Sequence, residues 1–210
     1  MGTAGADVIV GTAGRDEISA GDGDDRICGL DGNDFVFGGN GNDRIFLDNG
    51  SDVAFGEAGN DLIDGGADRD QLLGGAGRDF IAGGLGDDII TDGDAIGDFV
   101  VGNDGNDEIR ITGAGTNGTF NGNDGNDTLR VLSGSDHGFL DGGPGDDRLE
   151  GGPGNDELRG GAGNDLLFGS GGNDHLACDT LGLPQGTADV GNGGPGVDTQ
   201  LGCETTIDIP

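Results

Sequence analysis

Aspartate returns at nine-residue intervals along nearly the whole chain, and its carboxylate is the group whose type and spacing could do chemistry. If the chain folds regularly, these carboxylates stack into a ladder of like charges, which repels unless divalent cations lie between its rungs. Calcium suits such a ladder because it prefers several hard oxygen ligands, whereas the thiolates and imidazoles that zinc prefers are missing from the column. The candidate metal ligands are Asp7, Asp16, Asp25, Asp34, Asp43, Asp52, Asp61, Asp70, Asp79, Asp88, Asp107, Asp127, Asp147, Asp156, Asp165, Asp174 and Asp198.

Each of these aspartates occupies the sixth position of a nine-residue repeat. Ten repeats run without a gap over residues 2–91, and the register returns in 102–110, 122–130, 142–177 and, more weakly, 193–201. The first six positions are dense in Gly, Asn and Asp, which predicts a turn, and the last three alternate polar, apolar, polar, which predicts a very short strand. The apolar eighth position, predicted to point inward, holds Ile9, Ile18, Ile27, Val36, Ile45, Ala54, Ile63, Leu72, Ile81, Ile90, Ile109, Leu129, Leu149, Leu158, Leu167 and Leu176.

The repeat predicts an all-β solenoid that forms a single domain over residues 1–210. Two repeats placed back to back would close one coil of about 18 residues, and about ten stacked coils would give two parallel sheets with a thin aliphatic filling. Within this domain we expect regular repeats at 2–91, irregular turns on one edge at 92–141 and regular repeats again at 142–177. Residues 178–210 are expected to hold a non-repeat insertion, a last weak repeat and a C-terminal cap.

The composition indicates that the chain needs cations in order to fold. Its 210 residues include 52 glycines and only 31% hydrophobic residues, and 41 acidic side chains outnumber nine basic ones to give a net charge of -32. So few apolar side chains cannot offset the conformational entropy of a backbone this rich in glycine, and the carboxylates repel one another. The charge also argues against nucleic acid and anionic membranes as partners, and no apolar run is long enough for a membrane span.

Units such as GGPGNDELR (151–159) and GGNGNDRIF (38–46) fit every fixed position of the pattern GGxGxDxUx. This pattern resembles the RTX, or haemolysin-type, calcium-binding nonapeptide repeat, and the resemblance covers almost the whole chain. It implies a right-handed parallel β-roll with calcium held in the turns between consecutive coils. It also implies that main-chain oxygens around positions two and four join the carboxylates as ligands, here those of Gly39, Gly41, Gly75, Gly77, Gly84, Gly86, Gly143, Gly145, Gly152, Gly154, Gly161 and Gly163.

The function predicted from these features is calcium binding by a secreted repeat module. Such a module would fold on binding about thirteen Ca²⁺ ions and act as a structural or export-assisting element, although no signal peptide is visible in this chain. No set of catalytic residues stands outside the repeats, so an enzyme is not predicted. An alternative is a calcium-dependent extracellular binding protein or adhesin that uses the irregular edge or an outward apolar stripe. The stripe consists of Phe35, Phe37, Val53, Phe55, Leu73 and Ile89.

Self-association is a further possibility left open by the sequence. It could use Phe35, Phe37 and Phe55, or the edge of the N-terminal coil, which has no visible cap.

Three odd-numbered repeats between residues 92 and 141 are irregular, and they all fall on one edge of the predicted roll. The ladder of ions is therefore expected to be continuous on the other edge and interrupted here. Phe99, Phe120 and Phe139 are expected to replace the aliphatic anchor in these repeats.

The three cysteines leave two alternatives open. Cys178 and Cys203 could form a disulfide that closes the C-terminal cap in an oxidising compartment, or both could remain free thiols. Cys28 occupies an outward position and is expected to be a spare thiol.

Overall fold

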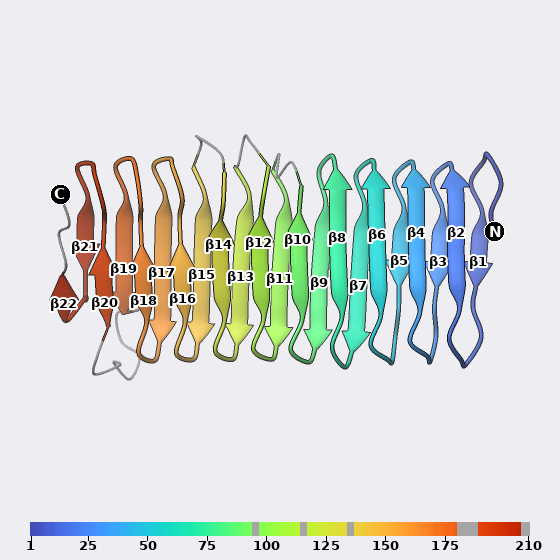
Figure 1. Cartoon of the computed structure of the whole chain (residues 1–210), viewed down its shortest axis with the longest axis horizontal. Helices are drawn as coiled ribbons and strands as arrows, with labels where there is room; N and C mark the ends of the chain where they lie inside the picture. The colour runs from blue at the N-terminus through green and yellow to red at the C-terminus, as the bar shows by residue number, and fades with distance from the viewer. Residues whose placement is uncertain (94–96, 114–116, 134–136, 180–188, 207–210) are drawn as a thin grey trace.

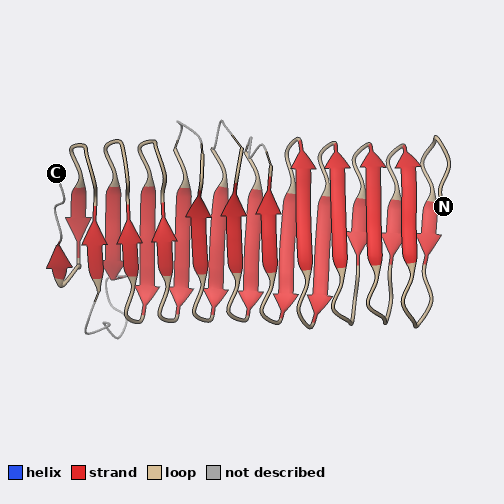
Figure 2. Cartoon of the chain, in the orientation of Figure 1, coloured by secondary structure: helices blue, strands red, loops and turns tan. Residues whose placement is uncertain are grey.

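A computed structural model describes residues 1–93, 97–113, 117–133, 137–179 and 189–206 of the chain. The secondary structure of these residues consists of strands, turns and bends (Figure 2). They include no helix that is long and apolar enough to cross a membrane. Residues 180–188 and 207–210, which belong to the predicted C-terminal insertion and cap, lie outside the described residues.

The strands form two eleven-stranded parallel sheets that face each other along the whole roll (Figure 1). The first sheet contains β1 (Val8–Val10), β3 (Arg26–Cys28), β5 (Arg44–Phe46), β7 (Leu62–Ala67), β9 (Phe80–Leu85), β11 (Phe99–Asp104), β13 (Thr119–Asp124), β15 (Phe139–Pro144), β17 (Glu157–Ala162), β19 (His175–Asp179) and β21 (Thr199–Leu201). The second sheet contains β2 (Glu17–Asp22), β4 (Phe35–Asn40), β6 (Val53–Ala58), β8 (Gln71–Ala76), β10 (Ile89–Asp92), β12 (Glu108–Ile111), β14 (Thr128–Val131), β16 (Arg148–Glu150), β18 (Leu166–Phe168), β20 (Val190–Asn192) and β22 (Thr205–Thr206). Successive strands of the chain alternate between the sheets, as the nine-residue repeat predicts.

The coils become longer at the irregular repeats, but the strands keep their register. In the regular part, hydrogen-bonded positions lie 18 residues apart, and this separation grows to 19 and then 20 across the irregular turns. It reaches 24 near the C-terminus, where β20 still pairs with β18 and β21 with β19. The parallel pairing on both faces fixes where each strand begins, so the strands keep their register although the number of residues between them changes.

The core is a double file of aliphatic side chains between the sheets, and it is formed mainly by the apolar eighth-position residues, as predicted. Of that column, only Ile9 in the first coil and Ile18, at 5% exposure, are not fully buried. Five buried residues of the first repeat position, Ala20, Leu47, Ile111, Val131 and Cys178, add to this filling.

The prediction that phenylalanine anchors all three irregular repeats is correct for Phe120 and wrong for the other two. Val100 and Leu140 are fully buried, whereas Phe99 is 38% exposed and Phe139 is half-buried. The cause is strand register: Phe99 is paired with the outward Phe80, and their rings stack at 5.3 Å. The following residue is then the one that points inward.

The predicted apolar stripe lies on the outer face of the second sheet, over β4, β6, β8 and β10. Its six side chains are half-buried rather than freely exposed. Phe35, Phe37 and Phe55 contact one another with ring centroids 4.9 to 5.6 Å apart. Aromatic pairs at such distances stabilise a sheet surface, so the rings shield one another from water.

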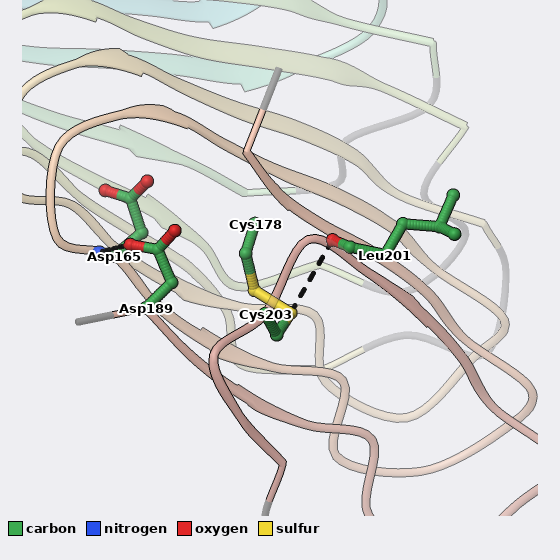
Figure 3. Close-up of a disulfide and its surroundings, with 5 residues drawn as sticks. All are labelled: Asp165, Cys178, Asp189, Leu201 and Cys203. Atoms are coloured by element: carbon green, nitrogen blue, oxygen red, sulfur yellow. Dashed lines mark hydrogen bonds between the residues drawn. A yellow bond between two sulfur atoms is a disulfide. The ribbon is translucent and has the colours of Figure 1, made fainter. Parts of the chain in front are cut away.

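A disulfide joins Cys178 to Cys203 and holds the last coils of the roll together (Figure 3). Cys178 is fully buried at the end of β19, and Cys203 follows β21. Cys28 is a half-buried free thiol. The structure thus supports the disulfide alternative over the pair of free thiols.

Removing this disulfide should destabilise the calcium-saturated protein. In the double variant Cys178→Ala/Cys203→Ala we expect the free energy of unfolding to fall by about 3 kcal/mol, since the bond closes a loop with a sequence separation of 25. Denaturant unfolding in excess calcium would measure this loss, with Cys28→Ala as the control that should leave stability unchanged. Equal stability of the double variant and the parent protein would contradict the prediction.

Candidate metal sites

The repeated aspartates end the turns just before the strands and stand in two columns, one along each edge of the roll. The continuous column contains Asp16, Asp34, Asp52, Asp70, Asp88, Asp107, Asp127, Asp147, Asp165 and Asp189. The interrupted column contains Asp7, Asp25, Asp43, Asp61, Asp79 and Asp98, followed after a gap by Asp156, Asp174 and Asp198. Every aspartate predicted from the sequence belongs to one of these columns.

Asp98 and Asp189 are two members that sequence reasoning missed. The sequence could have identified Asp98, because Asp98, the outward Phe99 and the buried Val100 match positions six, seven and eight of the nonapeptide. Asp189 had almost no such signal, since Gly191 stands where the aliphatic anchor is expected. Only the pairing of β20 with β18 reveals it.

Beyond the first coil, one oxygen of each column carboxylate ties its coil to the preceding one. The backbone N–H of Asp43, for example, donates to Oδ1 of Asp61 at 2.8 Å. Nine such hydrogen bonds link the continuous column and seven link the interrupted column, all 2.6 to 2.9 Å long. Because they are charge-assisted, these bonds fix the rotamer of each aspartate and hold its second oxygen in a constant place.

The second oxygen, Oδ2, is buried and accepts no hydrogen bond from the described residues at most positions of both columns. The columns are at most 3% exposed, except for the half-buried Asp7, Asp16 and Asp198. A buried carboxylate oxygen without a donor is costly unless a cation satisfies it. The column residues in this state are Asp25, Asp34, Asp43, Asp52, Asp61, Asp70, Asp88, Asp98, Asp107, Asp127, Asp147, Asp156 and Asp174.

Glycine at the first repeat position makes room for this oxygen. A Cβ added to Gly56 would lie 2.4 Å from Oδ2 of Asp61 and 2.5 Å from the carbonyl oxygen of Gly74 in the next coil. The same pairing of a carboxylate oxygen with a first-position carbonyl recurs at Gly65 and Gly142. This corner of the roll, between the first-position glycine, the aspartate and the next coil, is therefore lined with hard oxygen atoms. The first-position carbonyl oxygens are candidate calcium ligands that the sequence analysis did not name.

Glycines at positions two and four, a class that includes the glycines predicted to be ligands, direct their carbonyls along the stack of coils. The carbonyl oxygen of Gly59 would lie 1.9 Å from a Cβ on Gly77, and that of Gly143 would lie 2.0 Å from a Cβ on Gly161. Gly77 and Gly161 have positive φ angles of 129° and 114°, which favour glycine. The same glycines therefore allow the coils to stack closely and leave their carbonyl oxygens accessible.

Burial raises the pKa of the column carboxyls in the middle of the roll. It raises the pKa of Asp70 and Asp147 to about 8 and that of Asp61 and Asp127 to about 7. The hydrogen bond from the preceding aspartate lowers each pKa, and the neighbouring carboxylates raise it again. The ionised columns are therefore disfavoured without a counter-cation, and an oxygen-only donor set of this charge fits calcium.

The gap in the interrupted column lies at Gly118 and Gly138, which stand where aspartate is expected. In both repeats the first position, elsewhere mostly glycine, holds a buried aliphatic residue, Ile111 or Val131. The gap begins after Asp98, so it is shorter than the predicted interruption over 92–141. Apolar side chains occupy these corners in place of the carboxylate, which argues against an ion there.

Comparison with known protein families agrees with this geometry. The pattern described as "RTX calcium-binding nonapeptide repeat (4 copies)" matches residues 1–36, 29–54, 37–72, 64–91, 112–139 and 141–176, which together make up well over half of the chain. No curated protein matches the chain.

Proposed function

This chain belongs to the RTX calcium-binding nonapeptide repeat family, and we propose that it is a secreted module which, at pH 8, folds only when calcium fills the corners of its roll. The observation that carries the proposal is the series of buried Oδ2 atoms that accept no hydrogen bond from the described residues. Where calcium is scarce, the charged columns would hold the chain open. Where calcium is abundant, metal-binding free energy would become folding free energy.

The column carboxylates would hold the ions between consecutive coils. Calcium, when bound, would neutralise the paired carboxylates and cross-link neighbouring turns. Oδ1 keeps each aspartate in register through its backbone hydrogen bond, Oδ2 faces the corner, and glycine carbonyls complete the oxygen set. One ion for each linked pair of aspartates gives nine sites on the continuous column and seven on the interrupted one. This is slightly more than the thirteen or so predicted from the sequence.

Secretion fits the same chemistry. A chain with net charge -32 would remain extended where calcium is scarce, as inside cells, and would fold where calcium is plentiful outside them. The Cys178–Cys203 disulfide supports an oxidising destination. In this proposal the roll is a structural or export-assisting element, and it is not an enzyme.

Circular dichroism during a calcium titration tests the proposal. We expect a cooperative gain of strand signal as calcium is added to the metal-free protein at pH 8 and its loss when chelator is added. Magnesium at the same concentration serves as the control, because its small, strictly octahedral site fits this irregular oxygen set poorly. A strand signal that persists unchanged in excess chelator would overturn the proposal.

We propose no second function from the apolar stripe. The rings of Phe35, Phe37 and Phe55 already contact one another on the sheet surface, and this packing accounts for them.

A further inference from the structure

A third buried carboxylate, Asp92, joins the interrupted column at its last corner before the gap. Oxygen atoms of Asp79, Asp92 and Asp98 all lie within 4.8 Å of one another, and all three residues are buried. Asp79 and Asp98 are consecutive members of the column, linked by the hydrogen bond from Asp79 N–H to Asp98 Oδ1 at 2.7 Å. Asp92 is not a member, since it ends β10 at the first position of its repeat.

The first repeat position is the one from which a side chain enters the corner. At Gly74, one coil earlier, an added Cβ would lie 2.5 Å from Oδ2 of Asp79, and at Gly83 it would lie 2.3 Å from Oδ2 of Asp88. Asp92 therefore directs its carboxylate at the same place that the Oδ2 atoms of the column face. A regular corner has two carboxylates, one from each of two consecutive coils. An aspartate in place of glycine adds a third carboxylate to this corner.

Among the described residues, no salt bridge to an arginine or histidine satisfies the carboxylates of Asp92 and Asp98. Asp92 is fully buried; its Oδ1 accepts a hydrogen bond from the N–H of Gly93 at 2.7 Å, and its Oδ2 accepts none from a described N–H or O–H donor. Oδ2 of Asp98, which is 2% exposed, is in the same state. Three carboxylates in so small a buried space repel strongly unless a cation lies among them.

We propose that Asp79, Asp92 and Asp98 form a three-carboxylate calcium site, distinct in composition from the repeated sites of the roll and tighter than them. This inference rests on the proposed function, because it concerns one corner of the same calcium-binding edge. The affinity of an oxygen site for calcium rises with the number of its charged ligands. The extra carboxylate stands at the end of the column, where the next coil offers Gly118 instead of a further aspartate. This site would be the first to fill and the last to empty.

Calcium binding to the whole chain can be compared in Asp92→Asn and Asp92→Gly, the second of which restores the glycine of the repeat. Native mass spectrometry during a graded chelator titration would count the retained ions. We expect the most tightly held ion of the parent protein to be bound about tenfold or more weakly in both variants. Glu17→Gln removes one negative charge from an exposed strand position and should leave the titration unchanged.

Anomalous diffraction from crystals of the unmodified protein, grown with less than one equivalent of terbium, gives an independent result. Terbium is a hard cation that prefers oxygen ligands, and its strongest peak is expected among Asp79, Asp92 and Asp98. Two outcomes would overturn the inference: both variants titrating like Glu17→Gln, or a corner without metal in which Asp92 and Asp98 share a proton. If the parent protein binds no calcium at all, the proposed function itself fails. If the protein folds with calcium as proposed but the Asp92 variants bind calcium like the parent protein, only this inference is refuted.

Discussion

Gly172→Ala is expected to lower the free energy of unfolding of the calcium-saturated protein by about 3 kcal/mol or more. A Cβ at this position would lie 1.3 Å from the carbonyl oxygen of Gly154 in the preceding coil, and the φ angle of 126° is one that alanine rarely adopts. Because the obstacle is backbone, relief requires the two coils to separate. Separation would also displace the Gly154 carbonyl, a predicted calcium ligand, so calcium affinity should fall together with stability.

The neighbouring residue provides a matched control for this experiment. A Cβ on Gly171 would meet nothing within 4 Å, and Gly171 does not have a positive φ angle. Gly171→Ala should therefore change the free energy of unfolding by no more than about 1 kcal/mol, and reduced chain entropy in the unfolded state could make that change favourable. Urea unfolding of both variants in excess calcium measures the difference. Equal stability of the two variants would show that close stacking of the coils does not require glycine at position 172.

Acid should fold the metal-free chain that remains open at pH 8. Burial raises the pKa of Asp70 and Asp147 to about 8 and that of Asp61 and Asp127 to about 7, from the ordinary value of 3.8. Between about pH 4 and pH 8 the rolled chain therefore binds more protons than the open chain. Its free energy of unfolding falls as pH rises through this window and is greatest below it. We expect the strand signal of the metal-free protein to grow as the pH is lowered from 8 toward 4.

The calcium-loaded protein should respond to pH in the opposite direction. Its ions need ionised carboxylates, so acid competes with calcium and stability is lost as the pH falls. Asp70→Asn gives a second control, because a neutral side chain of the same shape should stabilise the metal-free roll at pH 8 while weakening calcium binding. Circular dichroism from pH 4 to pH 8, with and without calcium, measures both effects. A metal-free strand signal that does not respond to pH would contradict the prediction.

The sequence by itself determined the repeating unit of this protein. A nine-residue period with glycine early, aspartate sixth and an aliphatic residue eighth is strictly local information. It was sufficient to predict two parallel sheets, an inward column such as Ile63, Leu72 and Ile81, and the column aspartates. The prediction succeeded because each repeat contacts only its neighbours, so that one period repeated in register specifies the whole stack.

Only the tertiary structure decided which residues enter the core and the aspartate columns where the nine-residue period fails. In irregular repeats, hydrogen bonding to both adjacent coils chooses which residue enters the core, and this choice placed Val100 inside and Phe99 outside. The same pairing assigned Asp189 to the continuous column across an insertion. It also brought Asp92 against Asp79 and Asp98, which sequence spacing alone does not place in one corner. The physical reason is that the stacking of coils constrains the backbone of the strands, whereas the turns at the edge tolerate different numbers of residues. Where the turn length varies, the spacing of residues in the sequence no longer predicts which of them come into contact.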